Sequence, residues 1–259
     1  MKKSKISWTS ITWNPTTGCT KISAGCRECY SCPMSIRLKA MGQIKYKNGF
    51  RLTVHPSLIE LPYLWKKPCL VFVNSMSDLF HIDVPIEFIL EVFRVMNDTP
   101  QHTYQILTKR HELLSKYDSE GLLNWSDNIC MGVSVEDKDN ISRIDSLRKI
   151  GAKTKFLSCE PLLSALPNLN LNGIDWVIAG AESGPKARQM QEEWAIDIRN
   201  QCSNSGIPFF FKQFGKAKYN PNQNDPTIMK EHPEHAKGGC MLKGKIYHEM
   251  PKSMEKIVK

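Results

Sequence analysis

The chain has 259 residues, of which 41% are hydrophobic, so it can bury a sizeable core without disulfides or metals as staples. Its longest apolar run is far shorter than the ~20 residues that a membrane span requires, and its N-terminal stretch lacks the apolar segment of a secretory signal. We therefore expect a cytoplasmic protein with no membrane partner. The formal net charge of +9 suits a phosphate-bearing partner, although such a charge also serves solubility alone.

Short apolar segments alternate with helical patterns along most of the chain. Several of these segments are continuously apolar, which is typical of strands that are covered on both faces. After an early strand near residues 6–13, strands are predicted at 70–74, 103–107, 129–135, 154–158, 175–179 and 207–211. Helices are predicted over residues 85–97, 137–151 and 191–206, and Pro85 suits the first helical position.

This alternation predicts an α/β fold built from parallel βαβ units. A full or partial (β/α) barrel fits the pattern, and so does an open doubly wound sheet. Both architectures bind ligands at the C-terminal ends of their strands, where this sequence places its polar clusters. We expect residues 1–215 to form the β/α barrel, and residues 216–259 to form a loop-rich lid or an extension of the same domain.

Four of the nine cysteines, Cys19, Cys26, Cys29 and Cys32, lie close together in the sequence. In a reducing compartment such a group indicates a metal or cluster site. Three thiolates can hold a [4Fe-4S] cluster and leave one iron open, whereas four would close the shell of a structural zinc. The spacing does not separate these alternatives, but the position between an early strand and a helix favours iron–sulfur. A ferredoxin-like cluster with Cys32 as the fourth ligand is a third interpretation.

Eight ordered motifs resemble a widespread phage and bacterial family of radical-SAM-like proteins. They are WNPTTGC, GCRECY, NSMSDLFH, QHTYQILTKR, GVSVED, EPLL, DWVIAGAESGP and PFFFKQFG, spanning about residues 12–215. The family has three cysteines in its first motif, so the resemblance implies Cys19, Cys26 and Cys29 as cluster ligands and leaves Cys32 out. The more familiar radical SAM signature has three residues between the first two cysteines, and this chain has six.

The resemblance implies a radical SAM barrel whose cluster loop follows the first strand. Such an enzyme uses a [4Fe-4S] cluster to cleave S-adenosylmethionine (SAM), with an electron from a donor such as flavodoxin or ferredoxin. The implied cofactor-binding residues are Tyr30 near the adenine, Ser75, Ser77 and Asp78 at the ammonium, Lys109 at the carboxylate, Ser134 and Glu136 at the ribose, and Glu160 and Glu182 at later strand ends. Plainer roles compete: packing for Tyr30, helix capping for Asp78, a solvated turn for Lys109 and turn capping for Glu160.

Nucleic acid or a nucleotide is the expected substrate, to be modified or repaired, because the chain is basic and the family occurs in phages. The stretch 215–244 is interpreted as a lid that suits a phosphate backbone, with a soluble loop as the alternative; it carries Tyr219 among Lys216, Lys218, Lys230, Lys237 and Lys243. Two other functions stay open. One is a radical SAM enzyme acting on a small metabolite or peptide, and the other is a non-enzymatic zinc or iron–sulfur protein that binds nucleic acid.

Overall fold

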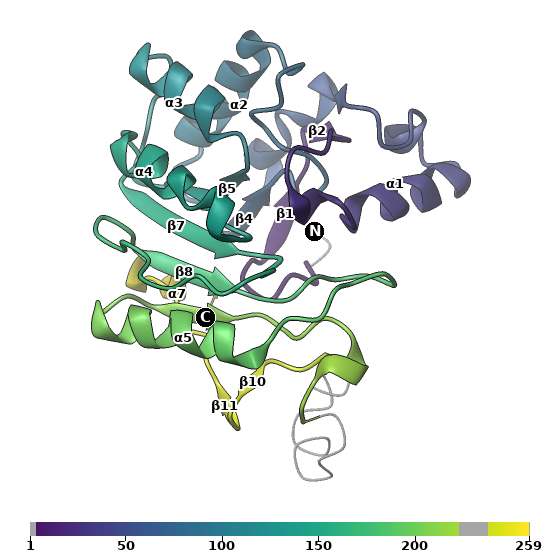
Figure 1. Cartoon of the computed structure of the whole chain (residues 1–259). Coiled ribbons are helices and arrows are strands. Elements are labelled where there is room, and N and C mark those ends of the chain that lie inside the picture. Colours follow the sequence, from purple (N-terminus) through teal and green to yellow (C-terminus); the bar gives the residue numbers. More distant parts are fainter. Residues whose placement is uncertain (1–3, 223–237, 259) are drawn as a thin grey trace.

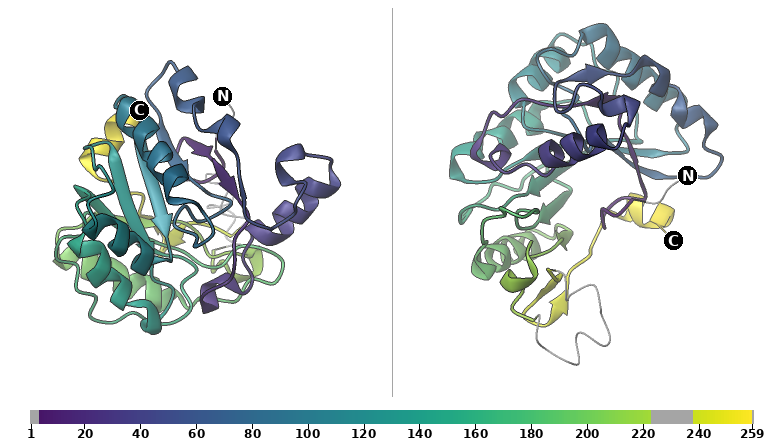
Figure 2. Two further views of the ribbon diagram at one scale, coloured as in Figure 1. Left: turned by 90° about the horizontal axis from the view of Figure 1, so that it is seen from above. Right: turned by 90° about the vertical axis from the view of Figure 1, so that its right-hand side faces the viewer.

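The computed structural model describes residues 4–222 and 238–258 (Figure 1). Seven strands form one parallel sheet in chain order: β1 (Ile11–Trp13), β4 (Leu70–Val73), β5 (Thr103–Thr108), β6 (Ile129–Ser134), β7 (Thr154–Cys159), β8 (Trp176–Ala179) and β9 (Phe209–Phe211). In the described part of the chain β1 and β9 do not pair, so the sheet is an open, curled half-barrel (Figure 2). The α/β prediction is confirmed in its partial-barrel form, because a doubly wound sheet would not keep its strands in sequence order.

Helices cover the outer face of this sheet. They are α2 (Ile86–Asp98), α3 (His111–Ser119), α4 (Ser142–Lys149) and α5 (Glu192–Asn204), preceded in places by the 3-10 turns η3 (Pro56–Leu58), η4 (Leu61–Leu64) and η5 (Lys138–Asn140). The helix predicted over 137–151 is broken, because the Asp137 side chain accepts a hydrogen bond from the Asp139 backbone and starts a separate turn. Pro85 is the cap of α2 and not its first helical residue.

The strands contribute alternate side chains to two separate cores. Val71 and Val73 of β4 face the helices, whereas Phe72 faces the inside of the half-barrel. There it meets Trp8, with ring centroids 4.6 Å apart, in an aromatic cluster completed by Phe156, Trp176 and Phe210. The C-terminal helix α7 (Lys252–Val258) adds the buried Met254 to this cluster. Apolar side chains therefore fill the base of the half-barrel, and its polar groups lie at the C-terminal strand ends.

Between β1 and β4 the chain leaves the sheet and returns to it. The short strands β2 (Thr16–Thr17) and β3 (Thr53–Val54) pair antiparallel and bracket this excursion, which holds η1 (Ala24–Cys26), α1 (Ser31–Ala40) and η2 (Ile44–Tyr46). We call residues 18–30 the cysteine loop and residues 31–51 the arm. The arm projects from the body of the molecule, at the end to which the strands of the half-barrel point (Figures 1 and 2).

The described part of the C-terminal stretch contains η6 (Ala217–Tyr219) and a hairpin of β10 (Met241–Leu242) and β11 (Lys245–Ile246). The hairpin confirms the short extra strand expected near the C-terminus. Lys230 and Lys237 of the predicted lid lie outside the described residues. Among the described helices, none has the length and apolar character needed to cross a membrane.

Candidate iron–sulfur and SAM site

The cysteine loop lies across the C-terminal ends of the strands. Side chains that follow four different strands hold it there by hydrogen bonds: Ser77 Oγ to the Gly18 carbonyl (2.6 Å), Arg110 Nη2 to Thr20 Oγ1 (2.8 Å), Ser23 Oγ to Glu136 Oε1 (2.7 Å) and Arg188 Nη2 to the Ala24 carbonyl (3.0 Å). The expectation of a cysteine loop at the head of the scaffold, at the ligand-binding edge, is therefore met by the geometry.

The thiols of Cys19, Cys26 and Cys29 are half-buried and free, and Cys32 lies on α1. Burial, with a smaller contribution from the Asp78 carboxylate, raises the pKa of Cys19 to about 11. Within the described residues, no three His, Cys, Asp or Glu side chains already converge as metal ligands. Three thiols on one loop are the donor set of an iron–sulfur cluster, so the donor chemistry fits, and the loop must draw these sulfurs together when it binds one.

Glu136 is the strut between this loop and the sheet. Its carboxylate is fully buried and makes ion pairs of 2.6 Å with Lys109 Nζ and with Arg143 Nη1. Burial alone would raise the pKa of Glu136, but these two cations outweigh it and the pKa lies below its usual value. Gly25 of the loop packs on the same carboxylate so closely that a Cβ there would lie 2.5 Å from Oε1.

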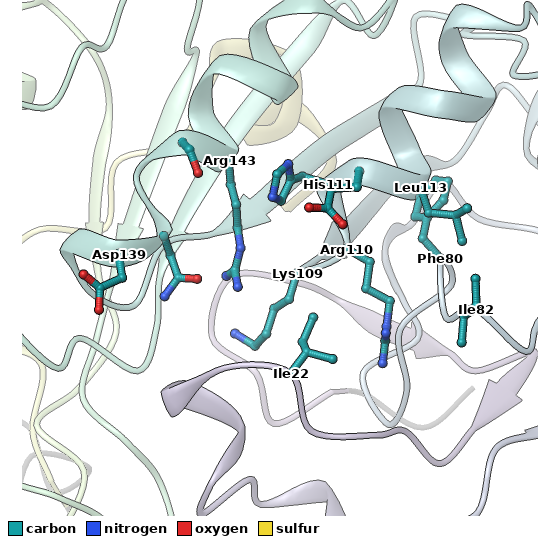
Figure 3. Close-up of a pocket in the computed structure, with 12 residues that line it drawn as sticks. Ile22, Phe80, Ile82, Lys109, Arg110, His111, Leu113, Asp139 and Arg143 are labelled. Carbon is teal, nitrogen blue, oxygen red and sulfur yellow. The ribbon is translucent and has the colours of Figure 1, made fainter.

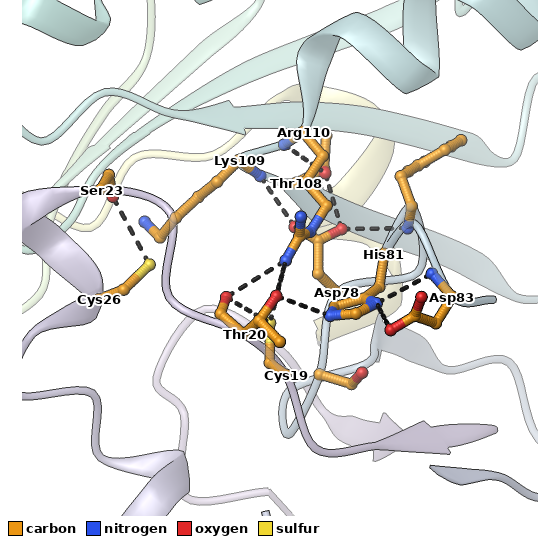
Figure 4. Close-up of polar contacts among 12 residues, drawn as sticks. Cys19, Thr20, Ser23, Cys26, Asp78, His81, Asp83, Thr108, Lys109 and Arg110 are labelled. Carbon is orange, nitrogen blue, oxygen red and sulfur yellow. Dashed lines mark hydrogen bonds and ion pairs between the residues drawn. The ribbon is translucent and has the colours of Figure 1, made fainter. Parts of the chain in front are cut away.

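Asp78 joins the ends of β4 and β5. Its buried carboxylate accepts hydrogen bonds from Thr108 Oγ1 at 2.7 Å and from the Lys109 backbone at 3.1 Å (Figure 4). It also accepts from the Phe80 backbone at 3.0 Å within a turn, so the helix-capping alternative for Asp78 is wrong. Arg110 lies above it, with Nε 4.0 Å from Asp78 Oδ2.

A buried histidine stands behind Cys19. The Asp83 backbone N–H donates to His81 Nδ1 at 3.1 Å, so the proton of the neutral ring is on Nε2, which donates to Thr20 Oγ1 at 2.8 Å. Burial, and then Arg110, lowers the pKa of His81 and keeps the ring neutral. Since Thr20 Oγ1 accepts from both His81 and Arg110, its own hydroxyl is left as a donor beside Cys19 (Figure 4).

The later strand ends carry two more carboxylates. Glu160 after β7 pairs with Lys212 Nζ at 2.6 Å, and Glu182 after β8 forms a two-point ion pair with Arg188. Burial would raise the pKa of Glu182, but Arg188 holds it below its usual value. Ser134 is buried near the end of β6, and its carbonyl accepts from Arg143 Nη1 at 2.7 Å.

The remaining predicted residues hold neighbouring backbone. The Tyr30 hydroxyl donates to the Ser75 carbonyl at 2.6 Å, and Ser75 Oγ donates to Asn14 Oδ1 at 3.1 Å. Tyr30, Ser75 and Ser77 are thus at the site, where they fix the turn after β4 against the cysteine loop and α1. Their contact with a cofactor stays a prediction.

Two hollows adjoin the loop. One, of 330 Å³, is lined by Ile22 of the loop and by Lys109, Arg110 and Arg143 (Figure 3). The other, of 530 Å³, is lined by Cys19 and by Arg51 of the arm. Both lie within reach of the cysteines, and the first presents cations that suit an anionic group.

Comparison with known families gives one match over nearly the whole chain. The family described as "Protein of unknown function (DUF5131)" matches residues 3–251. This chain belongs to the DUF5131 family. The matched range contains the cysteine loop, the arm and all seven strands of the half-barrel. No curated protein sequence matches the DUF5131 chain.

Solved structures of spore photoproduct lyase share the fold of the DUF5131 chain. The complex with dinucleoside spore photoproduct has 12% sequence identity and a TM-score of 0.52, over 82% of this chain and 78% of that one. A cysteine-to-serine mutant and a tyrosine-to-phenylalanine mutant of the same lyase reach TM-scores of 0.54 and 0.53 at the same identity and coverage. At this identity the likeness shows the fold alone, which is the partial barrel of the radical SAM type.

Gly18 of the DUF5131 chain provides a test of how tightly the loop is seated. Its φ of +82° disfavours other residues, and a Cβ would collide with the Arg51 carbonyl. Gly42 has a similar φ of +71° but open space around it. We expect Gly42→Ala to lower the unfolding free energy by about 1 kcal/mol and Gly18→Ala by about 2–4 kcal/mol, in chemical denaturation. Equal losses would contradict the close seating.

Proposed function

We propose that this protein is a radical SAM enzyme that modifies or repairs nucleic acid or a nucleotide. Cys19, Cys26 and Cys29 would hold a [4Fe-4S] cluster, which supplies the electron that cleaves SAM to a 5′-deoxyadenosyl radical. The observation that carries the proposal is the three-cysteine loop, fastened by side chains across the C-terminal strand ends of an open half-barrel. An electron donor such as flavodoxin or ferredoxin, and a reducing cytoplasm, would complete the system.

The residues around the loop divide into those that hold it and those that can meet a ligand. Lys109 and Lys212 are each paired with a carboxylate but keep part of their side chains exposed, so each can also bind an anionic ligand group. We assign the SAM carboxylate to Lys109, and the SAM hydroxyls and ammonium to the oxygens of Asp78 and Ser134. Glu136 acts on SAM through Lys109, because its own oxygens are already used by three protein groups.

Two observations support nucleic acid over a small metabolite. Lyases of the same fold were solved with a dinucleoside spore photoproduct, which is support by analogy of fold. The basic net charge of +9 favours a polyanion as partner. A radical SAM enzyme for a metabolite or peptide remains the second candidate, and the nucleic-acid dependence of SAM cleavage distinguishes the two.

Reductive SAM cleavage tests the proposal directly. The anaerobically reconstituted protein, given dithionite and SAM, is expected to release 5′-deoxyadenosine and methionine, measured by liquid chromatography and mass spectrometry. Addition of DNA or RNA oligonucleotides is expected to increase the yield. Cys26→Ala serves as the inactive control. A fully loaded protein that neither binds nor cleaves SAM would leave a redox or structural role in place of this enzyme.

A further inference from the structure

The positive charge of the chain is concentrated in the arm. Residues 31–51 contain no Asp or Glu, and they carry five of the basic residues that give the chain its net charge of +9: Arg37, Lys39, Lys45, Lys47 and Arg51. Elsewhere acidic and basic side chains are interspersed, as at Glu136 with its two cations. A surface of one sign raises the local concentration of partners of the opposite sign.

Four of these cations are free to bind a partner. Arg37, Lys39, Lys47 and Arg51 are exposed, and no ion pair joins them to any described residue. Lys45 is the exception, because its Nζ donates to the Asn14 carbonyl at 2.8 Å and burial lowers its pKa to about 8. The four free cations therefore have no structural role in the fold that would explain their presence together.

The arm is fixed beside the proposed catalytic site. It follows the cysteine loop directly, and its far end returns to that loop, where the Cys19 backbone N–H donates to the Phe50 carbonyl at 3.2 Å. Arg51 lines the same 530 Å³ hollow as Cys19. On the opposite side of the half-barrel, Lys216 and Lys218 flank the ring of Tyr219, each with Nζ within 5.5 Å of the ring centroid. Basic groups thus border the mouth on both sides (Figure 1).

We propose that the arm binds the phosphate backbone of a nucleic-acid strand next to the nucleotide that is held at the half-barrel. This inference rests on the proposed nucleic-acid substrate and adds that the substrate is an oligonucleotide and not a free nucleotide. Helix α1, with 10 residues, is about 15 Å long, which spans several phosphates. Exposed apolar side chains among the cations, such as Met41 and the 84% exposed Ile44, can contact sugars and bases.

The test compares two triple variants that remove the same charge. The arm variant carries Arg37→Gln, Lys39→Gln and Lys47→Gln. The control variant carries Lys66→Gln, Lys67→Gln and Lys149→Gln, three exposed lysines at the N-terminal edge of the sheet with no ion pair among the described residues. Fluorescence anisotropy is measured on labelled single strands of about 15 nucleotides and on a dinucleotide, across a salt series. Circular dichroism and thermal unfolding check that both variants fold.

The wild type is expected to bind the long strand more tightly than the dinucleotide. The arm variant is expected to lose at least about tenfold in affinity for the long strand, and about 2 units of the slope of log K against log salt, with the dinucleotide unaffected. The control variant is expected to resemble the wild type.

Each other outcome has a distinct meaning. An arm variant that binds both ligands like the wild type overturns the arm proposal and leaves the proposed function standing. A wild type that binds neither ligand overturns the nucleic-acid substrate as well. An arm variant that keeps strand binding but slows reduction of the cluster by flavodoxin, an acidic protein, reassigns the arm to a protein partner and overturns this proposal.

Discussion

Replacing Cys19, Cys26 or Cys29 with Ala is expected to abolish the iron–sulfur cluster, whereas Cys32→Ala is expected to keep it. Each of the three thiolates would bind one iron, so the loss of any one leaves a second iron open and the cluster falls apart. Iron and acid-labile sulfide analysis of anaerobically purified protein measures this, with about four irons per chain expected for the wild type and for Cys32→Ala.

The same experiment has an informative pH dependence. Burial raises the pKa of Cys19 to about 11, so this thiol is protonated at neutral pH in the metal-free protein and must lose its proton on binding. Cluster loading is therefore expected to strengthen as the pH rises from 6 toward 9. Stoichiometric zinc in place of iron, or loss of metal in Cys32→Ala, would favour the zinc interpretation with four cysteines.

Glu136→Ala is expected to destabilise the fold by about 3–5 kcal/mol, because it leaves Lys109 and the buried Arg143 without their shared carboxylate. Chemical denaturation of the metal-free protein measures the loss without any contribution from the cluster. The exposed pair of Glu91 and Arg94 gives a matched control, and Glu91→Ala is expected to cost less than about 1 kcal/mol. Similar losses for the two variants would show that Glu136 is not the strut described above.

The contribution of Glu136 also has a defined pH window. Its pKa is lower in the folded chain than in the unfolded one, so it stabilises the fold fully above the unfolded carboxyl pKa of about 4.3. This stability is lost as the pH falls through the folded pKa. The difference in unfolding free energy between the wild type and Glu136→Gln is therefore expected to be constant near neutral pH and to shrink below about pH 4.

The strands of the half-barrel were predictable because burial leaves a local signature. The continuously apolar runs at 70–74 and 154–158 became β4 and β7, whose alternate side chains enter the two cores. The arm and α7 left no such signature. Helix α1 has few buried residues and no apolar stripe, and α7 is held by the contact of Met254 with the aromatic cluster, which depends on residues far away in the sequence.

The candidate site was predictable only in part, for a similar reason. Strand ends can be read from the sequence, so Asp78 and Glu136 were found at the edge where the cysteine loop lies. Their partners Arg143 and Arg188 belong to segments that fold back onto this edge, and no local pattern distinguishes them from surface cations. Ser77, predicted as a ligand of SAM, has its hydroxyl on the Gly18 carbonyl, a contact that only the tertiary structure creates.

The hydrogen bond from the Cys19 backbone to the Phe50 carbonyl makes the arm and the cluster loop a single closed circuit of chain. A ligand that orders one end of this circuit changes the conformational freedom of the other. Thermodynamic linkage then requires reciprocity: if cluster loading tightens the hold of the arm on a strand by some factor, the strand must tighten the hold of the loop on its cluster by the same factor. The protein would guard its oxygen-sensitive centre best while its substrate is in place.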